Sequence, residues 1–272
     1  MNVTADASSY TAKPEHATRD APLRRAGFRD AFSAEIVKLF TVRSTVWTVV
    51  VMAAMTLGIA LFVGLTESLQ PDDTILGGSL TGASTAQIAA GIFGVLAVSG
   101  EYGGGTMRAT FTAYPRRASV LGAKATLVTG VALVVGLISC SISYGIGIMT
   151  LPDATYAQGD PMPALLGVAM AFSATAVMGL AIGTALRNPG GAITAVIGLL
   201  LMPTLFGQLF GDLQRWVAGA GPTAVVQKLA QSSDAVPEAV GSLGAWPSLL
   251  LLCAMSGAAW LIAARVLERR DA

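Results

Sequence analysis

The chain has 272 residues, of which 53% are hydrophobic and only 12% charged, with a net charge of +1 and a mean hydropathy of +0.65. A soluble domain usually carries about a quarter charged residues, so this chain has too few polar side chains to cover a water-soluble globule. The composition therefore predicts an integral membrane protein. Cys140 and Cys253 both lie in apolar runs, which favours buried thiols over a disulfide or a metal site.

The N-terminal region divides into a polar tail and an amphipathic segment. Residues 1–26 are polar and aperiodic, which predicts a disordered cytoplasmic tail. Residues 27–44 repeat apolar side chains at helical spacing, with charged residues such as Glu35 and Lys38 expected on the opposite side. This pattern predicts a helix lying in the membrane interface before the first span, and a soluble amphipathic helix is the alternative. The apolar residues of this helix are Phe28, Phe32, Ile36, Leu39 and Phe40.

Six uncharged stretches follow, and each is long enough to cross about 30 Å of hydrocarbon as a helix. They predict an all-α integral membrane protein with a six-span transmembrane domain over residues 45–270. The stretches are Thr45–Leu65, the later part of Thr74–Gly100, Ala125–Leu151, Met162–Leu186, Asn188–Gly211 and Trp246–Ala264.

The fourth and fifth stretches are separated only by Arg187 and the Asn-Pro-Gly-Gly sequence of residues 188–191. Proline and two glycines predict a tight turn there. A single broken span is the alternative, but the two runs together are too long for one. The segment Asp212–Ala245 is moderately apolar, and it fits either a short re-entrant or interfacial helix near Val225–Ala230 or a plain surface loop.

The basic residues predict the orientation of the spans. Fifteen of the 17 lie on one side: seven in the N-terminal region, four in or after the loop between the second and third spans, Arg187, and three near the C-terminus. Only Arg215 and Lys228 lie on the other side, together with most of the acidic residues of the loops. Because cytoplasmic loops carry the excess of Lys and Arg, both termini are expected in the cytoplasm, and six spans allow this.

Small residues recur every four positions along the fourth stretch. One face of that helix therefore lets another helix approach closely, and packing within the chain is favoured over a dimer interface. No Asp, Glu, Lys, Arg or His lies in the middle of a predicted span, which argues against an ion-driven carrier and for energy supplied from outside the membrane. The small residues are Gly167, Ala171, Thr175, Gly179 and Gly183.

Enzymatic motifs are missing from the sequence. None of the four lysines follows a glycine, so no P-loop is present. The single histidine, His16, lies in the polar tail, which leaves no Ser/His hydrolase arrangement in the spans and no cluster suited to zinc. The basic tail has too few aromatic residues and is too short to predict nucleic-acid binding.

The stretch Glu101–Arg117 is the internal segment that combines charged residues, a glycine turn and a short amphipathic run. Glu101 lies at the expected cytoplasmic end of the second span, and glycines 103–105 allow the chain to reverse. Thr106 is a suitable N-cap for a short helix, and Pro115 disfavours helical geometry at the residue before it, which ends the helix.

This short helix is expected to present three bulky side chains, Met107, Phe111 and Tyr114, on one face. Arg116 and Arg117 then lie at the level of the lipid head groups. The alternative is an ordinary helical hairpin whose apolar face lies against the bilayer and whose arginines follow the positive-inside rule.

Two groups of segments resemble a known family, first AEIVKL at 34–39 with VRSTVW at 42–47, and then EY at 101–102, GTMR at 105–108, PRR at 115–117 and Lys124. Over about Phe28–Arg270 the chain resembles the ABC-2 type permeases, the membrane subunits of ABC exporters. The resemblance implies an interfacial N-terminal helix and a coupling helix, between the second and third spans, that docks on a separate ATPase subunit. Gly103 and Gly104 depart from the family, whose members often carry larger polar or basic residues there.

The resemblance implies the permease subunit of an ATP-driven exporter in the cell membrane, with a path for a hydrophobic or amphiphilic substrate. It implies a homodimer or heterodimer of permeases, with ATP and Mg bound by the partner ATPase and no cofactor in this chain. The alternative is a membrane anchor or assembly factor that recruits a cytoplasmic partner without transport. The residues expected to form the ATPase-coupling loop are Glu101, Gly105, Thr106, Met107, Arg108, Phe111, Tyr114, Arg116 and Arg117.

The orientation can be tested with a reporter that is active only outside the cytoplasm. We expect activity for fusions after Asp73 or Asp153 and none for a fusion after Arg117, because loops rich in basic residues stay in the cytoplasm. Immunoblots of each fusion control for expression. The opposite pattern of activities would contradict the predicted orientation.

Overall fold

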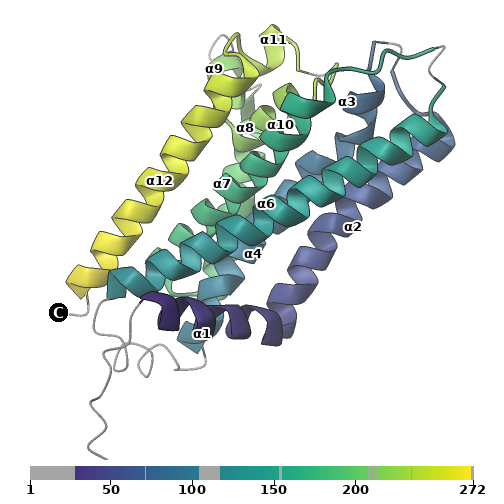
Figure 1. Cartoon of the computed structure of the whole chain (residues 1–272). Coiled ribbons are helices and arrows are strands. Elements are labelled where there is room, and N and C mark those ends of the chain that lie inside the picture. Colours follow the sequence, from purple (N-terminus) through teal and green to yellow (C-terminus); the bar gives the residue numbers. More distant parts are fainter. Residues whose placement is uncertain are drawn as a thin grey trace, which may run out of the picture.

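The computed structural model describes residues 28–103 and 117–270, except residues 71, 153–154, 208, 210, 212–213 and 234. The polar tail, residues 1–26, lies outside the described residues. Every regular element in the described ranges is a helix (Figure 1). The helices are α1 (Phe28–Thr41), α2 (Arg43–Thr66), α3 (Ile75–Ser79), α4 (Thr81–Gly103), α6 (Arg117–Thr150), α7 (Pro161–Leu186), α8 (Pro189–Phe206), α9 (Gln214–Gly219), α10 (Pro222–Leu229), α11 (Pro237–Val240) and α12 (Ala245–Arg270).

The six predicted spans are confirmed as helices of sufficient length and apolarity to cross a membrane: α2, α3 with α4, α6, α7, α8 and α12. The chain is therefore a multi-pass membrane protein by helix length and composition. Some boundaries differ from the prediction. Helix α6 begins at Arg117 rather than Ala125, because no proline or glycine pair interrupts it there, and α12 continues to Arg270 beyond the apolar run. Helix α8 ends at Phe206, shortly after Pro203, which lacks an amide donor.

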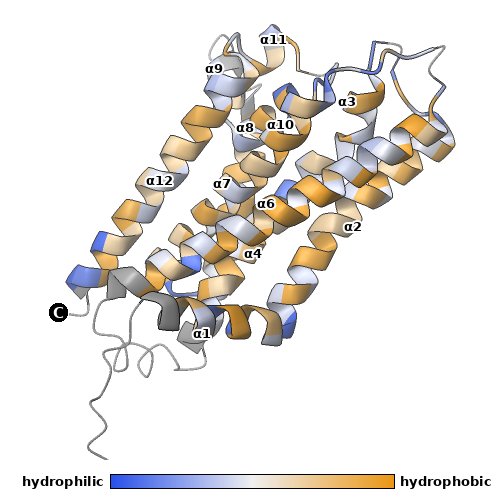
Figure 2. Cartoon of the chain, in the orientation of Figure 1, coloured by the Kyte–Doolittle hydropathy of each residue, from blue (hydrophilic) through white to orange (hydrophobic). Residues whose placement is uncertain are grey.

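Helix α1 lies crosswise at one end of the bundle, and the C-terminal end of α12 reaches the same end (Figure 1). Helices α9, α10 and α11 lie at the other end. Apolar residues cover the long sides of the spans, and hydrophilic residues gather toward their ends, as Figure 2 shows. This arrangement is the one that an even number of spans requires, and it brings the turn between α7 and α8 to the α1 end.

Helix α7 forms the centre of the bundle and packs against α4, α6, α8, α10 and α12. All five small residues of its predicted face are buried. A Cβ atom on Gly179 would collide with the carbonyl oxygen of Gly91, and one on Gly94 would collide with the carbonyl oxygen of Ala176. The backbones of α4 and α7 therefore touch directly, which confirms that the small face serves packing within the chain.

A tight turn joins α7 and α8 as predicted, but Arg187 and Asn188 form it rather than the proline and the glycines. Arg187 adopts the left-handed conformation, with φ of 53°, and its amide donates to the carbonyl of Gly183 at 3.0 Å. The Asn188 side chain then caps α8 by accepting from the amide of Gly191 at 3.2 Å. Pro189 and the two glycines lie inside the first turn of α8, where a proline is tolerated because its missing amide has no helical partner.

The segment after α8 is not a plain surface loop. Helix α10 is buried on its apolar side, where Val225, Val226 and Leu229 pack into the main core. Gln87 on α4 donates to the Thr175 hydroxyl at 2.9 Å and to the Pro222 carbonyl at 3.0 Å. These two bonds fasten the start of α10 to α4 and α7, so α10 is an integral part of the bundle.

Lys228 is the basic residue of α10. Its Nζ donates to the hydroxyl of Ser248 at 3.2 Å, and partial burial lowers the pKa of its amino group below the usual range. Asp73 accepts from the amide of Ser233 at 3.0 Å. These polar contacts join the α10 region to α12 and to the loop before α3.

The close approach of α4 and α7 predicts that replacing a glycine by alanine changes the stability of the protein differently at Gly94 and at Gly198. Gly94→Ala should destabilise the protein by about 1–3 kcal/mol, because its methyl group would force the two backbones apart. Gly198→Ala in α8 meets nothing within 4 Å. It should be neutral or stabilise by up to about 1 kcal/mol, because alanine favours the helix. Thermal unfolding of both variants in detergent measures the difference, and equal melting temperatures would contradict direct contact between α4 and α7.

Candidate functional site

The predicted interfacial helix packs by one face onto the start of α6. Leu39 is buried, and Phe32 and Ile36 are half-buried, in a cluster that includes Leu127 and Val128 of α6. The side chain of Phe28 lies outside the described part of the structure. Phe40 does not share the buried face, because it is 64% exposed. The best-buried face of α1 is thus directed at α6, and the predicted location of this helix in the membrane interface stays a prediction.

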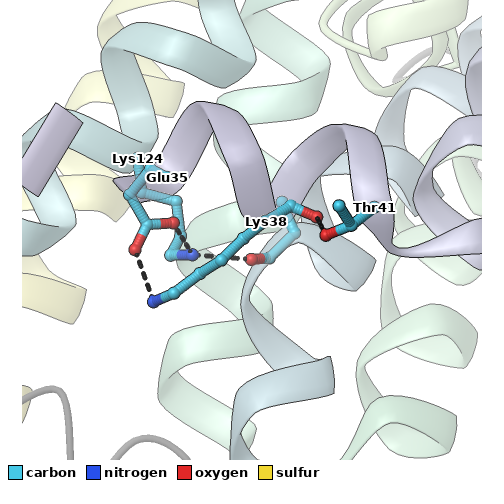
Figure 3. Close-up of polar contacts among 5 residues, drawn as sticks. Glu35, Lys38, Thr41 and Lys124 are labelled. Atoms are coloured by element: carbon cyan, nitrogen blue, oxygen red, sulfur yellow. Dashed lines mark hydrogen bonds and ion pairs between the residues drawn. The ribbon is translucent and has the colours of Figure 1, made fainter. Parts of the chain in front are cut away.

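Glu35 corrects the prediction that all charged residues of this helix lie on its polar side. Glu35 is 3% exposed and forms an ion pair with Lys124 of α6, which is also 3% exposed. Figure 3 shows the Glu35 carboxylate between the ammonium groups of Lys124 and Lys38. The physical reason is position, because Glu35 falls between Phe32 and Leu39 on the face that contacts α6.

The geometry of this cluster uses both carboxylate oxygens. Lys124 Nζ donates to Glu35 Oε2, and Lys38 Nζ donates to Oε1 at 3.0 Å. Lys124 also donates to the backbone carbonyl of Ala97 in α4, at 2.9 Å. One lysine therefore connects three helices: α1 by charge, α4 by a carbonyl and α6 by its own backbone.

Burial decides how much each ion pair contributes. The side chains of Glu35 and Lys124 are both 4% exposed, whereas that of Lys38 is 37% exposed. Desolvating two charges costs several kcal/mol per ion, so a buried ion pair is weak evidence of net stabilisation of the fold. Removing one partner of such a pair nevertheless destabilises the protein by about 3–5 kcal/mol, because the other charge then stays buried without it. An exposed pair contributes about 0–1 kcal/mol. The Glu35–Lys124 contact therefore fixes where α1 lies, and Lys38 adds little.

The cluster lies next to the predicted coupling loop in the chain. Glu101 falls in the last turns of α4, four residues after Ala97, and Arg117 is the first residue of α6. The side chains of these two residues are not described. The remaining predicted loop residues, Gly105, Thr106, Met107, Arg108, Phe111, Tyr114 and Arg116, lie outside the described residues. The structure therefore describes the two helices from which the loop emerges and leaves the expected ATPase contact as a prediction.

Sequence reasoning missed the pairing of Glu35 with Lys124, although a signal was present. Phe32, Glu35, Ile36 and Leu39 follow the i, i+3, i+4, i+7 spacing of one helix face. A carboxylate inside such an apolar face needs a cation from another element. Lys124 is the one charged residue of the apolar segment Val120–Thr150, and it is 89 residues away from Glu35 in the chain.

No group of three or more His, Cys, Asp or Glu side chains in the described part of the chain is arranged to hold a metal ion. Neither a protein-family model nor a curated protein matches this chain. The site is therefore defined by its own geometry, a buried ion pair that joins a crosswise helix to the two helices flanking residues 104–116.

Glu35→Gln should lower the melting temperature strongly, by an amount equivalent to as much as about 3–5 kcal/mol, because it takes the Glu35 carboxylate away from the buried Lys124 ammonium. The matched control Lys38→Gln should cost no more than about 1 kcal/mol, because Lys38 is partly exposed. The apolar double variant Glu35→Leu/Lys124→Met should recover much of the loss. Equal losses in Glu35→Gln and Lys38→Gln would argue against the buried pair as the anchor of α1.

Proposed function

We propose that this chain is the permease subunit of an ATP-driven exporter, of the ABC-2 type, coupled to a separate ATPase. The observation that carries the proposal is the connection made by Lys124. A force applied to the segment between α4 and α6 would act on the ends of both helices, and the Glu35–Lys124 pair would pass it to α1. Only Val42 separates α1 from α2, so α2 would respond as well.

The energy for this movement would come from a partner. The sequence contains no P-loop, and its spacing predicts that Met107, Phe111 and Tyr114 would form an apolar face between two spans on which an ATPase would dock. Fifteen basic residues on one side of the spans support a cytoplasmic location for this face and for both termini, and hence a cell-membrane protein. ATP and Mg would bind to the partner, not to this chain.

A second permease copy would complete the transport path. Large apolar side chains at the end of α8 and beyond it are exposed, among them Met202 at 58%, Leu205 at 67% and Leu209 at 78%. A surface of this kind needs lipid or another subunit to cover it. Spans without charged residues at their centres suit a hydrophobic or amphiphilic cargo.

The direct test is affinity purification of the full chain from native membranes in mild detergent. We expect an ATPase with a Walker A motif to co-purify with the wild type and with Phe111→Leu, but not with Phe111→Asp, because a carboxylate would be desolvated in the apolar contact. The reporter fusions establish that each variant is still inserted. Undiminished association of Phe111→Asp would refute the docking role.

Transport separates the exporter from a membrane anchor that only recruits a partner. Inverted vesicles carrying the complex should accumulate an amphiphilic dye only when ATP is added. Stable association with the ATPase but no ATP-dependent accumulation of any amphiphile would favour the anchor.

A further inference from the structure

An apolar groove of about 550 Å³ lies between α1, α2 and α6. Its walls include Phe40 of α1, Val46 and Val50 of α2, and Gly130 and Val134 of α6. The four large residues of this set are between 37% and 64% exposed, so the groove opens to the outside of the bundle. Two of its three walls belong to helices long and apolar enough to cross a membrane, so in a bilayer the mouth of the groove would face hydrocarbon chains.

The lining of the groove is almost entirely apolar. Thr126 is the one polar residue among its lining residues, and its hydroxyl already donates to the carbonyl of Gly122 at 2.9 Å. A Cβ atom on Gly130 would meet nothing within 4 Å, so the α6 wall is open at this point. The groove therefore suits an alkyl chain and gives no hydrogen bond to a polar ligand.

The groove fits within one leaflet. Its lining on α6 extends from Thr126 to Val135, a rise of roughly 14 Å along a helix. Because α6 runs obliquely across the bundle (Figure 1), the groove is shallower than this rise, and one half of a hydrocarbon core of about 30 Å can contain it. The groove begins at α1, which lies crosswise at the end of the bundle, so it belongs to the leaflet on that side (Figure 1).

A basic residue, Arg43, lies at the α1–α2 end of the groove. Arg43 is exposed and lies three residues from each of two lining residues, Phe40 and Val46. The junction of α1 and α2 accordingly changes from hydrophobic to hydrophilic in Figure 2. No ion pair joins Arg43 to another described residue. An arginine at this depth is well placed to contact a lipid phosphate.

From these observations we propose that the groove is a binding site for one acyl chain of an anionic phospholipid, with the head-group phosphate at Arg43. The apolar walls hold the chain by removing it from the bulk bilayer into a fitted slot. The charge of Arg43 selects an anionic head group over a zwitterionic one. The lipid site does not depend on an ATPase, so its test is independent of the test of the exporter function.

The test uses full-length protein in phosphatidylcholine vesicles that contain a small fraction of phosphatidylglycerol with a photoreactive acyl chain. After irradiation, adducts are mapped by mass spectrometry. We expect them to concentrate at Val50 and Val134 over Leu250 and Ile262, which are exposed apolar residues of α12. Equal labelling of α12 would mean ordinary annular lipid and would overturn the proposal. Chain-to-chain adducts at Val134 in place of lipid adducts would assign the groove to a second copy and overturn it too.

Two variants with matched controls separate the parts of the site. Gly130→Leu should abolish the groove adducts by filling the slot, whereas Gly145→Leu, on the same helix and also without a neighbour within 4 Å, should leave them unchanged. Arg43→Gln should reduce the preference for phosphatidylglycerol over phosphatidylcholine about fivefold, and the exposed Arg265→Gln should not. Melting temperatures confirm that all four variants fold. Unchanged labelling in Gly130→Leu would refute the site.

Discussion

The position of α1 depends on one constraint, the need of the Lys124 ammonium for a counter-charge in a buried place. A charged side chain at the boundary of the hydrocarbon is costly unless it is paired. Lys124 obtains its partner from α1, since Glu35 and the Ala97 carbonyl accept its hydrogen bonds. Helix α1 must therefore lie across the start of α6. Only Val42 lies between α1 and α2, so the pair holds α1 beside the start of the first span, and that span packs against α4 and α6 by its own residues.

The centre of the bundle is held in a different way. Between α4 and α7 the absence of a Cβ atom on Gly94 and Gly179 lets the backbones meet, and a small displacement would open a void or cause a collision. Gln87 then fastens α10 to the same pair of helices. The inner helices are thus packed backbone against backbone, whereas α1 is held by a local ion pair and an apolar face.

How far the sequence predicts this structure depends on the range of each interaction. The six spans and the small face of α7 follow from local patterns, since apolar length and the four-residue spacing of Gly167 to Gly183 are visible within one segment. Glu35 and Lys124 are 89 residues apart in the chain, so the periodicity of either helix cannot indicate which residue of another helix it pairs with. The sequence does not decide between a helix and a loop at α10, because eight residues are too few for a periodic signal. The helix is also fastened by a hydrogen bond from the distant Gln87, which local patterns do not reveal. Of the candidate site, the sequence predicted a helix with Phe32, Ile36 and Leu39 on one face but also placed Phe40 there, and it placed Glu35 on the wrong side.

The ion pair and the groove meet on the same helix. Phe32 and Leu39 belong to the cluster that packs against α6 and also line the groove, so α1 cannot shift without changing both. A lipid in the groove would therefore bias the position of α1 if it bound one position more tightly than another, and a ligand can shift an equilibrium only by that difference. By linkage, whatever moves α1 would change the affinity for the lipid by the same factor. A lipid in the groove and the Glu35–Lys124 pair would thus act on the same helix, because both involve residues of α1 and α6.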